Sequence, residues 1–104
     1  GTALETALTG TFRFTLLKNQ HLNATRAETQ NELIAIGIDE TVDKAVETAL
    51  QHMVEWIMEE RPSLSQVDAE CLCSVATDVA VTQVVNGATR GAHAVIQKRH
   101  LPPK

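Results

Sequence analysis

The sequence predicts an α+β fold in which two consecutive helices pack on one face of a sheet of short antiparallel strands. Apolar residues alternate with polar ones near both ends of the chain and recur every three or four residues in the middle, and turn or cap residues separate these stretches. Because four short strands leave exposed edges, we expect this unit to be part of a larger β-rich fold or to lie beside another subunit.

The composition is that of a single unit over residues 1–104. Although 43% of the residues are apolar, only three are aromatic, so we expect an aliphatic core. No apolar run approaches the roughly 20 residues that cross a bilayer. The thirteen acidic residues outnumber the nine Lys and Arg residues, which leaves no basic surface for phosphates. The sequence therefore predicts neither a membrane nor a nucleic acid as partner.

The cysteines and the first residue bear on the cellular setting and the origin of the chain. Cys71 and Cys73 give neither a disulfide framework nor a paired zinc motif, and this favours a reducing, cytoplasmic setting. The chain begins at Gly1 without Met, so we expect a longer parent protein or a trimmed tag.

The first third of the chain is predicted to hold two strands. Phe12, Phe14 and Leu16 alternate with polar residues, which predicts a strand over residues 10–18. Residues 19–32 are polar and without period, as in a connection that lines a surface or a site. The apolar run over residues 33–38 predicts a buried strand.

The middle of the chain is predicted to form two helices in series. The first has Asp39 as its N-cap and ends at Arg61 and Pro62. Its apolar stripe consists of Val42, Val46, Ala49, Leu50, Met53 and Ile57. Ser65, with Asp68 three residues later, predicts the start of the second helix. The stripe of that helix is predicted to be Val67, Cys71, Leu72 and Val75, with one cysteine in the core and the other more exposed.

A hairpin is predicted over residues 80–98. Its first strand is rich in β-branched residues and leads into Asn86-Gly87, a turn signal that we expect within a loop of several residues. The predicted order of elements is therefore strand, strand, helix, helix, strand, strand.

Few side chains have the surroundings that chemistry requires. His93 lies between small residues and is a candidate ligand or general base, the alternative being a strand histidine bonded to a neighbour. Arg26 and Glu28 place a positive charge beside a carboxylate, as a site that cleaves amides does, or else form a solvated pair. Glu5 and Asp78 are single carboxylates, more typical of caps or surface groups.

Several stretches resemble the C-terminal part of the acetamidase/formamidase family, in the same order along nearly the whole chain. They are Gly1-Thr2-Ala3-Leu4-Glu5-Thr6, Phe12-Arg13-Phe14, the R-x-E-T pattern of Arg26-Ala27-Glu28-Thr29, Ile36-Gly37-Ile38-Asp39, Leu72-Cys73-Ser74-Val75-Ala76-Thr77-Asp78, Val81-Thr82-Gln83-Val84-Val85-Asn86-Gly87 and Gly91-Ala92-His93-Ala94. Members of that family are about three or more times longer than this chain.

The resemblance implies a hydrolase that converts small linear amides into ammonia and a carboxylic acid. It implies Glu5 and Glu28 as carboxylates near the site, Arg26 as a positioning or oxyanion-binding group, and His93 as a ligand or a supporting donor, while Asp78 pins the helix-to-strand junction. It also implies a divalent metal such as zinc, with its main ligands outside this chain.

The partners implied are a small linear amide substrate and either further copies of the chain or the remainder of a parent enzyme. Because the chain is short, an alternative stays open. A truncated, non-catalytic relative would act as a self-associating module or as a small-molecule binder.

Overall fold

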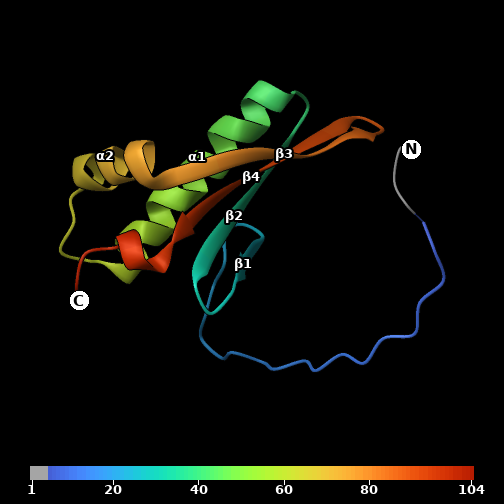
Figure 1. The fold of residues 1–104 in the computed structure, drawn as a ribbon, viewed down its shortest axis with the longest axis horizontal. Coiled ribbons are helices and arrows are strands. Elements are labelled where there is room, and N and C mark those ends of the chain that lie inside the picture. The colour runs from blue at the N-terminus through green and yellow to red at the C-terminus, as the bar shows by residue number, and fades with distance from the viewer. Residues whose placement is uncertain (1–4) are drawn as a thin grey trace.

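A computed structural model describes residues 5–104, so the Gly1 to Leu4 part of the opening motif lies outside the described residues. The chain forms a four-stranded antiparallel sheet with two helices on one of its faces (Figure 1). This is the α+β architecture that the sequence predicts. No helix within residues 5–104 combines the length and the apolar character needed to cross a membrane.

The sheet has the strand order β1-β2-β4-β3. Its strands are β1 (Arg26–Glu28), β2 (Glu32–Asp39), β3 (Thr77–Asn86) and β4 (Thr89–Gln97). β4 is central: all eight residues of β2 pair with it in a regular register, whereas its ladder with β3 is interrupted between Val81 and Gln83 and again before Asn86. β1 and β3 are the two edges, as expected for strands that nothing else in the described chain covers.

Alternation along the strands separates a helix-covered face of the sheet from an open face. On β2, Leu33 and Ala35 are fully buried, while Ile34 and Ile36 between them are partly exposed. Residues directly opposite each other in an antiparallel ladder lie on the same face. The pairing of Ala35 with Ala94 therefore assigns every strand residue to one face or the other.

Helix α1 (Val42–Glu60) supplies most of the cover of the sheet. Ala49, Met53 and Ile57 of the predicted stripe are buried, and Ala45 and Trp56 join them. The predicted N-cap is wrong: β2 continues through Asp39, and Thr41 is the cap, with its hydroxyl accepting from the amide of Lys44 at 3.3 Å. Helix α1 ends where predicted, with Arg61 as its C-cap, because Pro62 follows.

Helix α2 (Gln66–Ala76) begins as the sequence predicts but buries a different stripe. Ser65 and Asp68 form a capping box, in which each side chain bonds to the backbone amide of the other residue. The predicted stripe is largely wrong, because Val67 and Val75 are 66% and 83% exposed. Small residues, Ala69 and Cys73, face the core instead, which lets the helix approach it closely.

Strands β3 and β4 form the predicted hairpin with a shorter loop than expected. Asn86 pairs with Thr89, so only Gly87 and Ala88 connect the strands. Gly87 has φ of 63°, a left-handed conformation that glycine adopts at no steric cost and that two-residue hairpin loops require.

The strand predicted over residues 10–18 does not form in this structure. Residues 5–25 have no strand or helix and run away from the sheet as an extended trace (Figure 1). Phe12 and Phe14 are 78% and 92% exposed. The alternation in this segment fits a strand, but a strand needs a hydrogen-bonding partner, and the described residues give it none. The first strand is instead β1, inside the stretch predicted to be a connection.

One hydrophobic core lies between the helix-covered face and the two helices. Its buried members are Leu33, Ala35, Ala49, Met53, Trp56, Ile57, Ala69, Cys73, Ala94, Ile96 and Leu101. Apart from Trp56 these are aliphatic or small, so the expectation of an aliphatic core is confirmed.

Candidate functional site

Arg26 lies on β1 and is held against helix α1 by two interactions. Its Nη1 donates to the carboxylate of Glu59 at 2.6 Å, and its guanidinium carbon lies 4.3 Å from the centre of the Trp56 ring. The face of an aromatic ring attracts a cation, and a planar guanidinium stacks on it well. The charge of Arg26 is therefore already paired within this chain.

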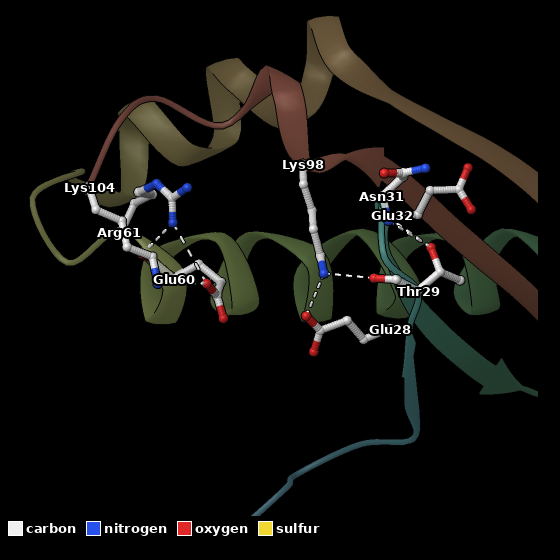
Figure 2. A network of polar contacts seen from close by, with 8 residues as sticks. All are labelled: Glu28, Thr29, Asn31, Glu32, Glu60, Arg61, Lys98 and Lys104. Atoms are coloured by element: carbon white, nitrogen blue, oxygen red, sulfur yellow. Dashed lines mark hydrogen bonds and ion pairs between the residues drawn. The ribbon is translucent and has the colours of Figure 1, made fainter.

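Glu28, two residues later on the same strand, is paired with the end of β4. Nζ of Lys98 lies 2.6 Å from Glu28 Oε1 and also donates to the carbonyl oxygen of Thr29 at 2.7 Å (Figure 2). Lys98 follows β4 directly, in a short 3-10 turn. The ammonium therefore fastens the end of β4 to the corner between β1 and β2. The two partners are 70 positions apart, and no local pattern in the sequence indicates this pair.

His93 lies in the middle of β4, on the open face of the sheet. Its Nδ1 is 2.7 Å from the hydroxyl oxygen of Thr82 on β3, the residue at the interruption between Val81 and Gln83. A hydroxyl can both donate and accept, so this contact fits either tautomer of the ring. Nε2 has no hydrogen-bond partner among residues 5–104 and is left for a proton or a ligand.

The sheet separates these candidates. Arg26 and Glu28 pair with Ala35 and Leu33, both on the helix-covered face, whereas His93 pairs with Ile36, on the open face. The structure thus brings Arg26 and Glu28 to one face and places His93 on the other. Within one copy of residues 5–104, they do not line a common cavity.

The remaining candidates lie apart from both positions. Glu5 is exposed in the segment that makes no strand or helix. Asp78 is exposed at the second position of β3, next to the helix-to-strand junction where it was expected, but its side chain makes no hydrogen bond or ion pair with residues 5–104. Cys73 is buried and Cys71 is exposed, in line with their opposite directions on the helix.

Sequence reasoning missed the residues that hold the candidates. Trp56 and Glu59 lie three apart on α1, a spacing that places both on one helix face, but nothing in the sequence connects them to Arg26. His52 of α1 contacts β2: its Nδ1 is 3.0 Å from the carbonyl oxygen of Ile36 and, because a carbonyl only accepts, this nitrogen must donate.

A cleft of about 610 Å³ lies between α1 and α2. Its apolar lining consists of Leu50, Val54, Met58 and Cys73, and its polar lining of Gln51, Glu55, Gln66, Glu70 and Ser74. None of the four predicted site residues lines it. A second, small cavity of about 30 Å³ lies beside Arg26, His52 and Trp56, enough for about one water molecule.

The possible metal-binding side chains of the described residues do not gather into a site. Within residues 5–104, no group of three or more His, Cys, Asp or Glu side chains is arranged to hold a metal ion. Asp68 has a pKa below its usual value, because the Ser65 hydroxyl and then the Ser65 amide donate to its carboxylate. That shift belongs to the cap of α2 and not to a reactive site.

Two solved structures have the fold of this chain. The chain is similar to the crystal structure of an acetamidase from Bacillus halodurans, with 28% identity and a TM-score of 0.65 over 72% of this chain and 25% of that chain. It is also similar to a recombinant predicted acetamidase/formamidase from Thermoanaerobacter tengcongensis, with 25% identity and a TM-score of 0.70 over 80% of this chain and 27% of that chain. No family model and no curated protein matches the chain.

These likenesses confirm the resemblance to the acetamidase/formamidase family. The chain spans about a quarter of the length of the structures that it matches.

Proposed function

We propose that the chain is the C-terminal part of an amide hydrolase that acts on the C–N bond of small linear amides such as formamide and acetamide. Ammonia and a carboxylic acid would be the products. One observation carries the proposal: 72% and 80% of the chain superpose on structures described as an acetamidase and as a predicted acetamidase/formamidase. The reaction itself is carried over from those proteins by resemblance.

Among the candidates, His93 is the best placed to take part in the chemistry. Thr82 holds Nδ1 and leaves Nε2 unpaired on the open face. With the proton on Nδ1, donated to the Thr82 hydroxyl, Nε2 has a lone pair that can remove a proton from a water attacking the amide carbonyl. This role requires the open face to be covered, because an amide substrate needs walls on more than one side.

Arg26 and Glu28 are less suited to contact the substrate, because both charges are already paired. In hydrolysis of an amide, a fixed positive charge would stabilise the oxyanion that forms on the carbonyl oxygen. Arg26 can do so only by exchanging Glu59 for the substrate, and Glu28 is neutralised by Lys98 in the same way. We expect both residues to shape the wall of the site and to orient β1 rather than to contact the reacting atoms.

A divalent metal such as zinc remains part of the proposal, with ligands outside this chain. Such an ion would polarise the carbonyl or acidify a bound water. The described residues do not by themselves fit a metal site, so no step of the reaction is assigned to it here.

A chimera tests the proposed function. The matching quarter of the B. halodurans acetamidase is replaced by this chain, and ammonia release from acetamide and formamide is measured. Activity of the chimera, with a loss of about a hundredfold in kcat for His93→Gln, is expected if His93 acts as general base. The Thr15→Val variant serves as the control, since Thr15 contacts none of these residues. A folded chimera without activity contradicts the proposal.

A second candidate function rests on the cleft between α1 and α2. Its volume of about 610 Å³ lies within the range of small-molecule sites, roughly 300–1,000 Å³, and its floor is apolar. A non-catalytic relative that binds a small apolar molecule is the function this cleft favours. Saturable binding of an anilinonaphthalene dye, lost in Val54→Glu and kept in the exposed-surface variant Glu47→Gln, is expected in that case. Absence of saturable binding by the folded wild type contradicts it.

A further inference from the structure

Residues 11–17, here called the arm, have the pattern of a strand but no strand partner among residues 5–104. Phe12, Phe14 and Leu16 alternate with polar residues and are 78%, 92% and 81% exposed. Three large apolar side chains in water on one short segment are unfavourable, at roughly 1.5–3 kcal/mol for each side chain left unburied. The arm therefore has much to gain from a partner.

The outer edge of β3 is the corresponding unfilled position on the sheet. β3 is ten residues long and ends the strand order, so on its outer side no strand of residues 5–104 pairs with it. The other edge, β1, is only three residues long, too short for a seven-residue arm. An exposed edge of unpaired amides and carbonyls is a template for an added strand.

The side chains of β3 match the arm on both faces. Val79 and Val81 pair with the buried Ala94 and Ala92, so they lie on the helix-covered face, yet they are 42% and 49% exposed. The aromatic side of the arm would cover them. Alternation then places Arg13 on the open face, the side on which Asp78 lies without an ion-pair partner among residues 5–104.

We infer that the arm of one copy adds as a fifth strand to β3 of a second copy, and that the exchange is reciprocal. Residues 5–104 contain both halves of this interface. One half is the arm, which pairs with no strand there, and the other is the outer edge of β3, which is also unpaired. The two aromatic residues and the leucine of each arm would together bury on the order of 1,000 Å², the lower bound for a specific interface. The inference does not rest on the proposed reaction.

Reach favours the second copy over the arm's own sheet. From β1 to a position outside β3 is four strand spacings, about 19 Å. The connection, residues 18–25, contains a turn at Lys18 and Asn19, with Asn19 at φ 61°. The six residues after this turn span only about 20 Å when fully extended, which leaves no slack for a path around the sheet to its far edge. Figure 1 shows the arm leaving the sheet at the β1 side and continuing away from it.

Native mass spectrometry and sedimentation of the full 104-residue chain give the first test. We expect a dimer of twice 11.3 kDa at micromolar to millimolar concentration. In the dimer, amides of the arm and of the outer edge of β3 should gain protection from hydrogen exchange together. Isotope-filtered NOE contacts between a labelled and an unlabelled copy should join Phe14 to Val79 or Val81, which identifies the contact as one between copies.

Variants in the arm separate this interface from folding. Phe14→Pro removes a ladder hydrogen bond and an aromatic side chain and should raise the dimer dissociation constant roughly tenfold or more. Thr9→Pro, outside the arm, should leave it unchanged. Because the arm contacts no element of its own copy, both variants keep the fold. Arg13→Asp and Asp78→Arg should each weaken the dimer several-fold, and the double variant should restore it.

Three outcomes would overturn the inference. They are a chain that stays monomeric at millimolar concentration with an unprotected arm, a monomer in which the arm is protected and so pairs with its own sheet, and a dimer that Phe14→Pro leaves intact.

Discussion

The two faces of the sheet are built from the same four strands, yet they differ in side-chain size and in cover. On the helix-covered face, the pairs of β2 and β4 include Leu33 with Ile96 and Ala35 with Ala94, all fully buried. On the open face the alternate positions carry larger side chains than alanine that remain at least partly exposed: Ile34, Ile36, Ile38 and Val95. Small residues thus mark where a helix lies close, and large apolar residues do not by themselves mark burial.

The open face also lacks the polar character of a face meant for water. An antiparallel sheet with one solvated face usually alternates apolar and polar residues, whereas β2 carries isoleucines there. His93 lies among these residues, and β3 with its exposed edge is next to it. The comparison teaches that the chain's own helices bury one face of the sheet, whereas the other face leaves apolar side chains exposed.

The largest contrast between the faces is expected at two glycines. A Cβ on Gly37 would collide with the carbonyl oxygen of Ala45 and lie 2.5 Å from the amide nitrogen of Ala49, both backbone atoms of α1. Gly37→Ala should therefore lower the free energy of unfolding by about 4 kcal/mol or more, or prevent folding. On the open face, a Cβ on Gly91 would lie 3.0 Å from Cγ of Gln83 and 3.4 Å from Cβ of Thr82, both side-chain atoms, with the nearest backbone atom 3.7 Å away.

Gly91→Ala is thus the matched control, with an expected change within about 1 kcal/mol. Urea titration followed by circular dichroism measures both variants. Equal losses in the two would show that the helix contact does not distinguish the faces.

Neighbouring residues on β2 give the next contrast. Leu33→Ala leaves a cavity in the core and should cost about 3 kcal/mol in unfolding free energy. Ile38→Ala removes a side chain that is 54% exposed on the open face and should cost less than about 1 kcal/mol. A large loss for Ile38→Ala at concentrations where the chain is dimeric, and a small one in the monomer, would show that a partner covers this face.

A smaller effect is expected at the polar pair of the open face. Thr82→Val removes the hydroxyl that contacts Nδ1 of His93, with about 1 kcal/mol or less of stability at stake because the contact is exposed. The Nδ1 signal of His93 in NMR should then shift, because this nitrogen loses its hydrogen-bond partner in either tautomer of the ring. Thr82→Ser, which keeps the hydroxyl, should retain the wild-type signals, and identical spectra for all three proteins would contradict the positioning role of Thr82.

The smallest effect concerns α2, one of the two helices that make the covered face. Asp68 has a lowered pKa in the folded chain, so its carboxylate stabilises the fold above about pH 5 and this contribution is lost as the pH falls through the lowered value. Wild type should lose more stability between pH 7 and pH 3 than Asp68→Asn, whose amide does not titrate. Parallel urea midpoints over this range would contradict the assignment.

The sequence predicted the elements whose signals are local. The spacing of Ala49, Met53 and Ile57 predicted α1, the Ser65 and Asp68 pair predicted the start of α2, and Asn86-Gly87 predicted the turn of the hairpin. The family resemblance likewise rested on short stretches in order. Each of these depends on residues close together along the chain, and so a single sequence contains the whole signal.

The errors arose where burial or pairing depends on distant residues. Residues 10–18 have the alternation of a strand, but a strand exists only beside another, and which one is available is not encoded in the segment. Val67 and Val75 are apolar enough for a core, yet α2 turns the smaller Ala69 and Cys73 toward the core instead. Local hydrophobicity does not report how near the neighbouring element comes.

The sequence by itself determined the α+β class, the order of elements and the residue types of the candidate site. Only the tertiary structure decided that Arg26 and Glu28 lie on the helix-covered face and His93 on the open one, with Glu59, Lys98 and Thr82 as their partners. The physical reason is strand register, since a shift by one residue would move every side chain to the opposite face, and register is set by cross-strand contacts between residues far apart in the sequence.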